Sequence, residues 1–334
     1  MRCRTKTPMR APEFWRTQSG LAALLAPLSE IYAMAGAVRQ RCTMPWRAPV
    51  PIICIGNLVA GGAGKTPVAI ATGAILHDLG KSVHFLSRGY GGSLPGPVQV
   101  NPSAHTAKQV GDEPLLLARI APTWVAKNRL AGAKAAISNG AEIIVMDDGF
   151  QNPSVAKTLS LIVVDGGYGF GNERVMPAGP LREPLPNGLS RADAVVVMGA
   201  DVTDAAKTIR RTAPDTQIID ARLAALRAAQ RYVGAKVLAF AGIGRPDKFF
   251  QTLKDLGCVL VAQHPFPDHY DYTPDDIAIL VEAAARENAV LLTTAKDFQR
   301  VPEDARPMVE VVDVVVEWRD PDAIKSLLLT ATRP

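Results

Sequence analysis

The sequence predicts an α/β fold: a P-loop NTPase-like parallel sheet, a second, smaller α/β domain and an N-terminal membrane-associated helix. A glycine-rich turn joins an apolar strand to a helix in residues 51–79, apolar runs alternate with helical patterns further along, and residues 20–38 are almost entirely apolar. The chain has 334 residues, of which 48% are hydrophobic, and this suits two compact domains of about 150 residues each.

The glycine-rich turn lies in residues 51–67, which read PIICIGNLVAGGAGKTP. In a strand–turn–helix context, backbone N–H groups converge on phosphate oxygens and the helix N-terminus adds partial positive charge. We expect Lys65 to reach the terminal phosphates and Thr66 to offer its hydroxyl to Mg²⁺. The usual G-x-x-x-x-G-K-[ST] pattern would place glycine at Val59, so the loop is a variant. The predicted nucleotide-binding residues of the loop are Gly61, Gly62, Ala63, Gly64, Lys65 and Thr66.

Strand-like and helical segments alternate after this loop, which is typical of parallel βαβ units. The predicted strands are 83–87, 143–146, 159–165 and 194–198, and the predicted helices lie around 114–120 and 128–139. A second βα series begins near Tyr232, and residues 201–231 are the expected connector. We therefore expect an N-terminal helix region at 1–50, a P-loop domain at 51–230 and a smaller α/β domain at 231–334.

The N-terminal region is basic and apolar. Residues 1–50 contain eight Arg or Lys and two Glu, a net charge of +6, and the remaining residues carry −1. Pro27 and Glu30 near the middle of residues 20–38 disfavour a membrane-spanning helix and favour one in the membrane interface. An amphipathic helix packed on the protein fits the pattern equally well. Because the main body is nearly neutral, the basic pI does not predict nucleic-acid binding.

Two adjacent carboxylates, Asp147 and Asp148, follow the predicted strand 143–146 in the run IIVMDDGFQ. Open α/β sheets bind ligands at the carboxyl ends of their strands, where P-loop enzymes keep the acid that holds Mg²⁺. We predict that Asp147 and Asp148 belong to the metal site with Thr66, one of them addressing the metal and the other supporting it. A solvated Asp-Asp-Gly turn is the alternative.

Three further side chains are candidates for the chemistry. Asp112, in VGDEP, is either a helix N-cap or the group that accepts a proton from a hydroxyl acceptor. His264 and His269 lie in HPFPDHYDY, where a metal role is disfavoured because no cysteine and no third histidine is near. A single histidine paired with a distant carboxylate is the favoured catalytic interpretation. Arg182 suits a phosphate or sugar contact, with a surface salt bridge to Glu183 as the alternative.

Six motifs occur in order along nearly the whole chain: GNLVAGGAGKTP, LSRGYGG, VGDEP, DDGFQ, PAGPLREP and FPDHY. In this combination the chain resembles the tetraacyldisaccharide 4'-kinases, the lipid A 4'-kinases of Gram-negative bacteria. The resemblance includes Val59, since the family also lacks the first P-loop glycine. In residues 291–300, LLTTAKDFQR, Ala295 stands where the family more usually has the glutamate of a Glu-Lys-Asp motif. For this reason no role is carried over to Lys296 or Asp297.

The resemblance implies ATP- and Mg²⁺-dependent phosphorylation of the 4'-hydroxyl of a tetraacylated glucosamine disaccharide 1-phosphate. It implies that Asp112 and His269 form an acid–base dyad at that hydroxyl, and that Arg182 lies near nucleotide or substrate. It also implies a peripheral location at the cytoplasmic face of the bacterial inner membrane. The expected partners are the lipid substrate and the membrane surface, without nucleic acid and without an obligate protein partner.

Two other functions share some of these features. A P-loop GTPase or metallochaperone-type NTPase would have the same GKT loop and Mg²⁺ acid, but its guanine-reading Asn-Lys-x-Asp is absent from the sequence. A membrane-bound scaffold with an inactive P-loop is disfavoured because Lys65, Thr66 and the paired aspartates are intact.

Overall fold

The computed structural model describes residues 12–333, and its α/β architecture confirms the predicted fold class. The basic residues Arg2, Arg4, Lys6 and Arg10 lie outside the described range. The described chain divides into two compact units. One contains the residues up to Arg222 together with those from Val316 onward, and the other is Leu223–Val315.

The first unit is built on a nine-stranded sheet of order β13-β8-β7-β6-β1-β5-β2-β4-β3. The strands from β8 to β4 pair in parallel, and β3 pairs with β4 in the antiparallel sense. Its strands are β1 (Ile52–Gly56), β2 (Val83–Ser87), β3 (Val98–Gln99), β4 (Thr123–Val125), β5 (Ile143–Asp147), β6 (Leu159–Asp165), β7 (Ala194–Met198), β8 (Gln217–Ala225) and β13 (Val314–Trp318).

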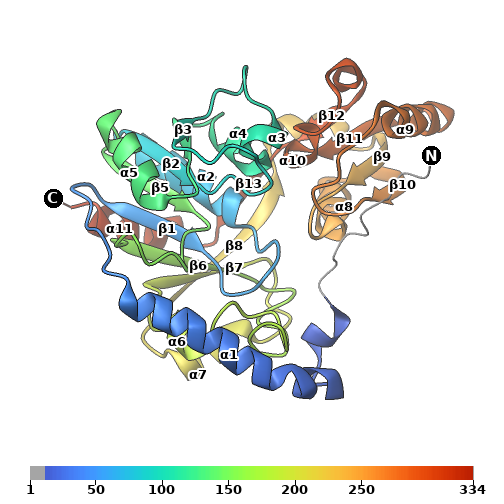
Figure 1. Cartoon of the computed structure of the whole chain (residues 1–334). Helices are drawn as coiled ribbons and strands as arrows, with labels where there is room; N and C mark the ends of the chain where they lie inside the picture. Colours follow the sequence, from blue (N-terminus) through green and yellow to red (C-terminus); the bar gives the residue numbers. More distant parts are fainter. Residues whose placement is uncertain (1–11, 334) are drawn as a thin grey trace. The chain divides into compact units, whose positions relative to one another are not determined.

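The helices of this unit connect the strands or flank the sheet, as Figure 1 shows for α2 and α5. They are η1 (Glu13–Arg16), α1 (Gly20–Cys42), α2 (Lys65–Asp78), α3 (Ala107–Val110), α4 (Asp112–Leu117), α5 (Arg129–Ser138), α6 (Leu185–Leu189), α7 (Ala205–Thr212) and α11 (Pro321–Ala331). The expected connector at 201–231 is not simply a linker, because it contains the whole of α7 and of β8.

The order of the central strands positions the site. β1 lies between β5 and β6, with Ile55 in register with Asp147 on β5. Because these strands are parallel, their carboxyl ends share one edge of the sheet. The turn that follows β1 and the aspartates that end β5 are therefore neighbours. All five residues of both strands are buried, which explains why each reads as a continuous apolar run.

The second unit has a four-stranded parallel sheet of order β10-β9-β11-β12. Its elements are η2 (Arg227–Tyr232), β9 (Lys236–Ala241), α8 (Pro246–Leu256), β10 (Val259–Pro265), α9 (Pro274–Arg286), β11 (Val290–Thr294), α10 (Ala295–Phe298), η3 (Glu303–Met308) and β12 (Glu310–Val312). The expected domain 231–334 differs from this unit at its end: β13 joins the nine-stranded sheet, beside β8. The apolar run VEVVDVVVEW thus divides at Asp313 into strands of two different sheets.

The N-terminal helix α1 is mostly exposed, and Figure 1 draws it as a long, continuous blue helix. Ala22 and Ser29 are its buried residues, whereas Leu24, Ile31 and Met34 are more than half exposed. Among the described residues it is the one helix long and apolar enough to cross a membrane. One of its contacts with the rest of the unit is polar: the Ser29 hydroxyl donates to Val175 O at 2.7 Å and accepts from Ala178 N at 3.1 Å. This weakens the interpretation of α1 as a helix packed on the protein through an apolar face.

Candidate active site

Hydrogen bonds from the Asn57 side chain fix the backbone of the loop between β1 and α2. Asn57, which is fully buried, donates from Nδ2 to Val59 O at 2.5 Å and to Gly61 O at 3.3 Å. Gly61 and Gly64 have φ angles of 122° and 89°, which side chains disfavour. The first helical residue is Lys65, so the loop amides and the positive end of α2 face the same space.

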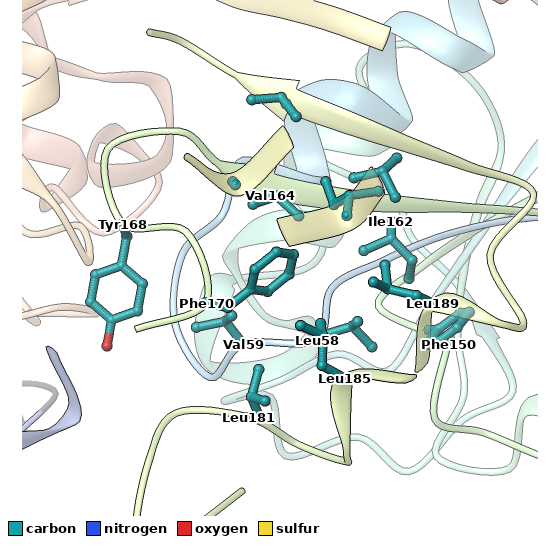
Figure 2. Close-up of a cluster of buried hydrophobic side chains, with 14 of the residues drawn as sticks. Leu58, Val59, Phe150, Ile162, Val164, Tyr168, Phe170, Leu181, Leu185 and Leu189 are labelled. Carbon is teal, nitrogen blue, oxygen red and sulfur yellow. The ribbon is translucent and has the colours of Figure 1, made fainter. Parts of the chain in front are cut away.

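At Val59, where the usual pattern has its first glycine, the loop is anchored to the segment around Leu181. The Val59 side chain is 8% exposed and its backbone forms an isolated bridge with Leu181. Figure 2 shows Val59 with Leu58, Leu181 and Leu185 in one cluster of buried apolar side chains. The neighbouring Ala60 N–H donates to Pro180 O at 2.8 Å. The variant loop is thus packed against the segment that carries Arg182.

Asp147, the last residue of β5, faces the start of α2. Its Oδ2 accepts a hydrogen bond of 3.0 Å from the Thr66 hydroxyl. Asp147 is 3% exposed, and its Oδ1 is buried without a hydrogen-bond partner. Burial raises the pKa of Asp147 to about 7, although Lys65 opposes the shift. A buried carboxylate oxygen with no donor, beside a threonine hydroxyl, suits a hard cation such as Mg²⁺.

Asp148 faces a different set of partners, because its backbone adopts a left-handed conformation with φ 54°. Its Oδ1 accepts 2.8 Å from Arg182, its Oδ2 accepts 3.3 Å from the same guanidinium, and Lys65 Nζ lies 3.9 Å from Oδ2. Burial opposes ionisation, but Lys65 and Arg182 outweigh it and the pKa of Asp148 is lowered. The solvated Asp-Asp-Gly turn considered above is therefore wrong for Asp147, which is 3% exposed, whereas Asp148 has a 37% exposed side chain that is paired with two cations.

Lys65 sits between the two carboxylates in a confined space. Its side chain is 12% exposed, and burial lowers the pKa of its ammonium while Asp148 opposes that shift. A partly desolvated ammonium interacts more strongly with an incoming polyanion than a solvated one. The three predicted residues Lys65, Asp147 and Asp148 thus do come together, with Thr66.

Arg182 lies in this group and not in a salt bridge with Glu183. Glu183 pairs instead with Arg191, and Arg182 also donates to Gln151 Oε1 at 3.3 Å. The surface salt bridge to Glu183 suggested for Arg182 is wrong, because the Arg182 guanidinium bonds to Asp148. The backbone N–H of Arg182 donates to Leu58 O at 2.8 Å. The arginine is fixed at both its backbone and its side chain.

Gln151 and Asn57 are two site residues that sequence reasoning missed. The Gln151 amide donates to Asn57 O at 3.0 Å and to Glu183 Oε1 at 3.1 Å. It thereby connects the phosphate loop to the segment of Arg182. The signal was present in the sequence, since Gln151 ends the DDGFQ run and Asn57 directly follows β1.

Asp112 is the first residue of α4 and is 4% exposed. The N-cap position belongs to Gly111, with φ 92°, and no side chain caps this helix end, so the N-cap role suggested for Asp112 is wrong. The charge of the adjacent Glu113 adds to the burial that raises the pKa of Asp147, and it partly opposes the burial that lowers the pKa of Lys65. The beginning of α4 therefore belongs to the electrostatic environment of the phosphate loop.

His269 belongs to the second unit, on the loop between β10 and α9. Its φ angle is 58°, and its backbone N–H donates to Gly242 O at 3.0 Å. Its Nε2 lies 3.3 Å from Lys296 Nζ and 3.8 Å from Asp268 Oδ1. His264 lies separately, within β10. No group of three or more His, Cys, Asp or Glu side chains that could hold a metal occurs among residues 12–333.

Comparisons with known proteins identify the family of this chain. The family model described as tetraacyldisaccharide-1-P 4'-kinase matches residues 21–333. A tetraacyldisaccharide 4'-kinase of Rhodospirillum centenum is 50% identical and one of Rhodospirillum rubrum is 51% identical; the alignments cover 96% of this chain in both cases, and 96% and 97% of the relatives.

A solved structure is also similar over nearly the whole chain. It is the crystal structure of LpxK from Aquifex aeolicus in complex with ATP, with a TM-score of 0.72 and 26% identity, covering 94% of this chain and 100% of that one. With the match to residues 21–333 and relatives half identical over their whole length, this chain belongs to the tetraacyldisaccharide-1-P 4'-kinase family.

Proposed function

We propose residue roles for the reaction of this chain, which is the ATP-dependent phosphorylation of the 4'-hydroxyl of a tetraacylated glucosamine disaccharide 1-phosphate in lipid A biosynthesis. The proposal rests on the different partners of the two adjacent aspartates: Asp147 bonds to Thr66, whereas Asp148 pairs with Lys65 and Arg182. A GTPase or metallochaperone-type NTPase is not supported by the relatives.

Thr66 and Asp147 are the residues that would hold Mg²⁺. The partnerless buried Oδ1 of Asp147 supports this assignment, because an ionised carboxylate oxygen in that position requires a cation or a donor. When bound, Mg²⁺ offsets the negative charge of the phosphate oxygens. Asp148 has a different role: it fixes the ammonium of Lys65 and the guanidinium of Arg182 before nucleotide binds.

Lys65 and the amides of residues 61–64 bind the phosphates of ATP. Phosphoryl transfer depends chiefly on positioning and on electrostatic stabilisation, because the transition state spreads charge over the phosphoryl oxygens. Arg182, held by Asp148 and Gln151, supplies a planar donor pair suited to such oxygens. These cations are fixed before substrate binds, so little reorganisation accompanies the reaction.

Asp112 and His269 act on the acceptor hydroxyl in this proposal. Asp112 is supported by its burial at the start of α4, next to Glu113, whose charge acts on Lys65. His269 is supported by the FPDHY motif and by its strained, tethered backbone. Together they would orient the hydroxyl and accept its proton, a contribution of about 10² to 10⁴ in rate.

The chain acts in lipid A biosynthesis at the membrane, and we propose that α1 binds peripherally to the cytoplasmic face of the inner membrane. Leu24, Leu28, Ile31 and Met34 follow one another at helical spacing and are 75%, 53%, 61% and 62% exposed. Exposed apolar side chains on this scale favour an apolar environment. Ser29 keeps the opposite side attached to the protein.

The reaction is tested with the purified chain alone, labelled ATP, Mg²⁺ and a detergent-dispersed acylated glucosamine disaccharide 1-phosphate. We expect label on the lipid, and we expect Asp112→Ala and His269→Ala to lower kcat by about 100-fold or more while ATP binding is retained. Nucleotide hydrolysis without lipid labelling would refute the function.

Membrane binding is tested separately with vesicles containing anionic lipids. The double variant L24E/I31E should lose vesicle binding and keep ATP affinity, because both side chains lie far into solvent on the described surface. The matched control is Ile279→Glu, which changes a 65% exposed isoleucine on α9. Equal loss of vesicle binding in the control would contradict the role of α1.

A further inference from the structure

Two charged side chains, Lys296 and Asp268, lie beside His269 within the second unit. Lys296 Nζ lies 3.3 Å from His269 Nε2 and 3.8 Å from Asp268 Oδ1, and Asp268 Oδ1 lies 3.8 Å from His269 Nε2. The side chains of Lys296 and His269 are 22% and 29% exposed. The Lys296 ammonium is thus within hydrogen-bond distance of Nε2 of the His269 imidazole.

The backbone around this cluster is fixed by one buried carboxylate, Asp297. It is fully buried and accepts hydrogen bonds from Gly242 N, Tyr272 Oη and Arg300, at 2.9, 2.9 and 2.7 Å. Gly242 in turn accepts from the backbone N–H of His269. Asp297 therefore ties the His269 loop to α10, the short helix that carries Lys296.

The chain is closely packed around Gly242, the residue that bonds to both Asp297 and His269. A Cβ at this glycine would lie 2.8 Å from Pro267 O and 2.9 Å from Tyr272 Oη. Thr294 closes the other side, since its hydroxyl donates to Asp297 Oδ2 at 2.6 Å and accepts from Asp297 N at 3.0 Å. The position of Lys296 beside His269 is thus built into the fold and is not a chance contact of a surface lysine.

The chemistry of the pair assigns a tautomer. An ammonium has three donors and no acceptor, so a ring nitrogen that bonds to it must accept. A neutral imidazole has one donor and one acceptor nitrogen. We propose that Lys296 is a positioning residue that holds His269 as the Nδ1–H tautomer, with the lone pair of Nε2 directed at Lys296 Nζ.

This inference deepens the proposed function and rests on the role given there to His269. With Nε2 engaged by Lys296, Nδ1–H is the nitrogen that can donate to a carboxylate. The hydrogen bond made by one ring nitrogen selects the role of the other, as in other acid–base histidines. Asp268 lies near both Nε2 and Nζ, and it balances the charge of Lys296. The competing interpretation is that Lys296 pairs with Asp268 alone and leaves the tautomer unaffected.

The tautomer is measured on the full chain in detergent, labelled with ¹⁵N-histidine, by multiple-bond ¹H–¹⁵N correlation spectra at alkaline pH. His269→Gln identifies the signals of His269 among the five histidines. We expect the Nδ1–H pattern in the native chain and in Lys296→Arg, and the Nε2–H pattern, which predominates for free histidine, in Lys296→Met. Lys254→Met, on α8 of the same unit, is the matched control and should keep the native pattern.

The spectrum of the native chain can overturn the proposal by itself. The test therefore gives a result even if Lys296→Met does not fold. An Nε2–H pattern in the native chain contradicts it, as does an unchanged pattern in a folded Lys296→Met. We also expect Lys296→Met to lower kcat by about 10-fold or more at constant KM for ATP, with Lys296→Arg partly active. If the native chain shows the Nδ1–H pattern but does not label the lipid, the proposed function fails and the tautomer assignment stands.

Discussion

Asp147 and Asp148 are adjacent in sequence and both are near Lys65, yet they differ in exposure, in hydrogen-bond partners and in the direction of their pKa shifts. Asp147 is buried, bonds to a neutral hydroxyl and has a pKa raised to about 7 by burial. Asp148 is partly exposed, bonds to two cations and has a lowered pKa. The left-handed backbone at Asp148 separates them, because an extended residue there would continue the strand. Two identical residues thus differ in their partners: Asp147 has one oxygen without a hydrogen-bond donor, and Asp148 is paired with two cationic side chains.

The largest effect that tests this difference is expected from Asp147→Asn. The amide keeps the shape but removes the charge that would balance Mg²⁺, so we expect kcat to fall by about 10³-fold or more. Titrations of Mg²⁺ at fixed ATP should show a matching loss of metal affinity. ATP binding measured without Mg²⁺ should be little changed, and a large loss there would mean that Asp147 does not hold the metal.

Asp148→Asn should have a smaller effect, about 100-fold on kcat/KM, because the cations remain but lose their orientation. Mg²⁺ affinity should be nearly unchanged, in contrast to Asp147→Asn. The measurement is the same pair of titrations on both variants. Asp193→Asn is a suitable control, since Asp193 accepts from Ser160 N at 2.7 Å away from the phosphate loop. Equal metal loss in both aspartate variants would abolish the distinction.

The sequence predicted the members of this site but not their pairing. The carboxyl end of a parallel strand next to a phosphate loop required an acid, and both Asp147 and Asp148 were named on that ground. Which of them faces Thr66 depends on φ at Asp148, and single-sequence patterns carry no information about one backbone angle. For the same reason Arg182 was placed in the site while its partner Asp148 was not foreseen.

The fold was predictable where periodicity is strong and local. The strands 159–165 and 194–198 have the expected bounds, because buried parallel strands read as continuous apolar runs. The run from Val309 to Trp318 was ambiguous, since nothing in its composition marks Asp313 as the boundary between two sheets. Sheet membership depends on long-range pairing, here of β13 with β8.

Gln151→Ala sharpens the comparison by loosening Arg182 without changing any charge. Arg182 would lose one of its contacts and Asn57 O would lose a donor, each worth about 1 kcal/mol. We expect kcat/KM to fall by about 10-fold, with the Mg²⁺ dependence of the native chain retained. Gln299→Ala, in the second unit, is the control and should be silent in the same assay. A shift in Mg²⁺ affinity would instead connect Gln151 to Asp147.

The smallest expected effect is on the pH dependence of stability. Because the pKa of Asp147 is raised from 3.8 to about 7 in the folded chain, the folded state binds this proton more tightly than the unfolded state. The contribution to the unfolding free energy is therefore fully present below about pH 4 and is lost as pH rises to about 7. Asp148, with a lowered pKa, contributes in the opposite sense at lower pH.

Asp147→Asn isolates the first of these contributions. Between about pH 5 and about pH 8, the Tm of the native chain without nucleotide should fall by several degrees more than the Tm of the variant, at about 2–4 °C per kcal/mol. Scanning calorimetry of the two proteins in matched buffers measures the difference. Parallel pH dependences would show that Asp147 is already ionised in the folded chain near pH 5, and the contrast between the two carboxylates would then lie only in their partners.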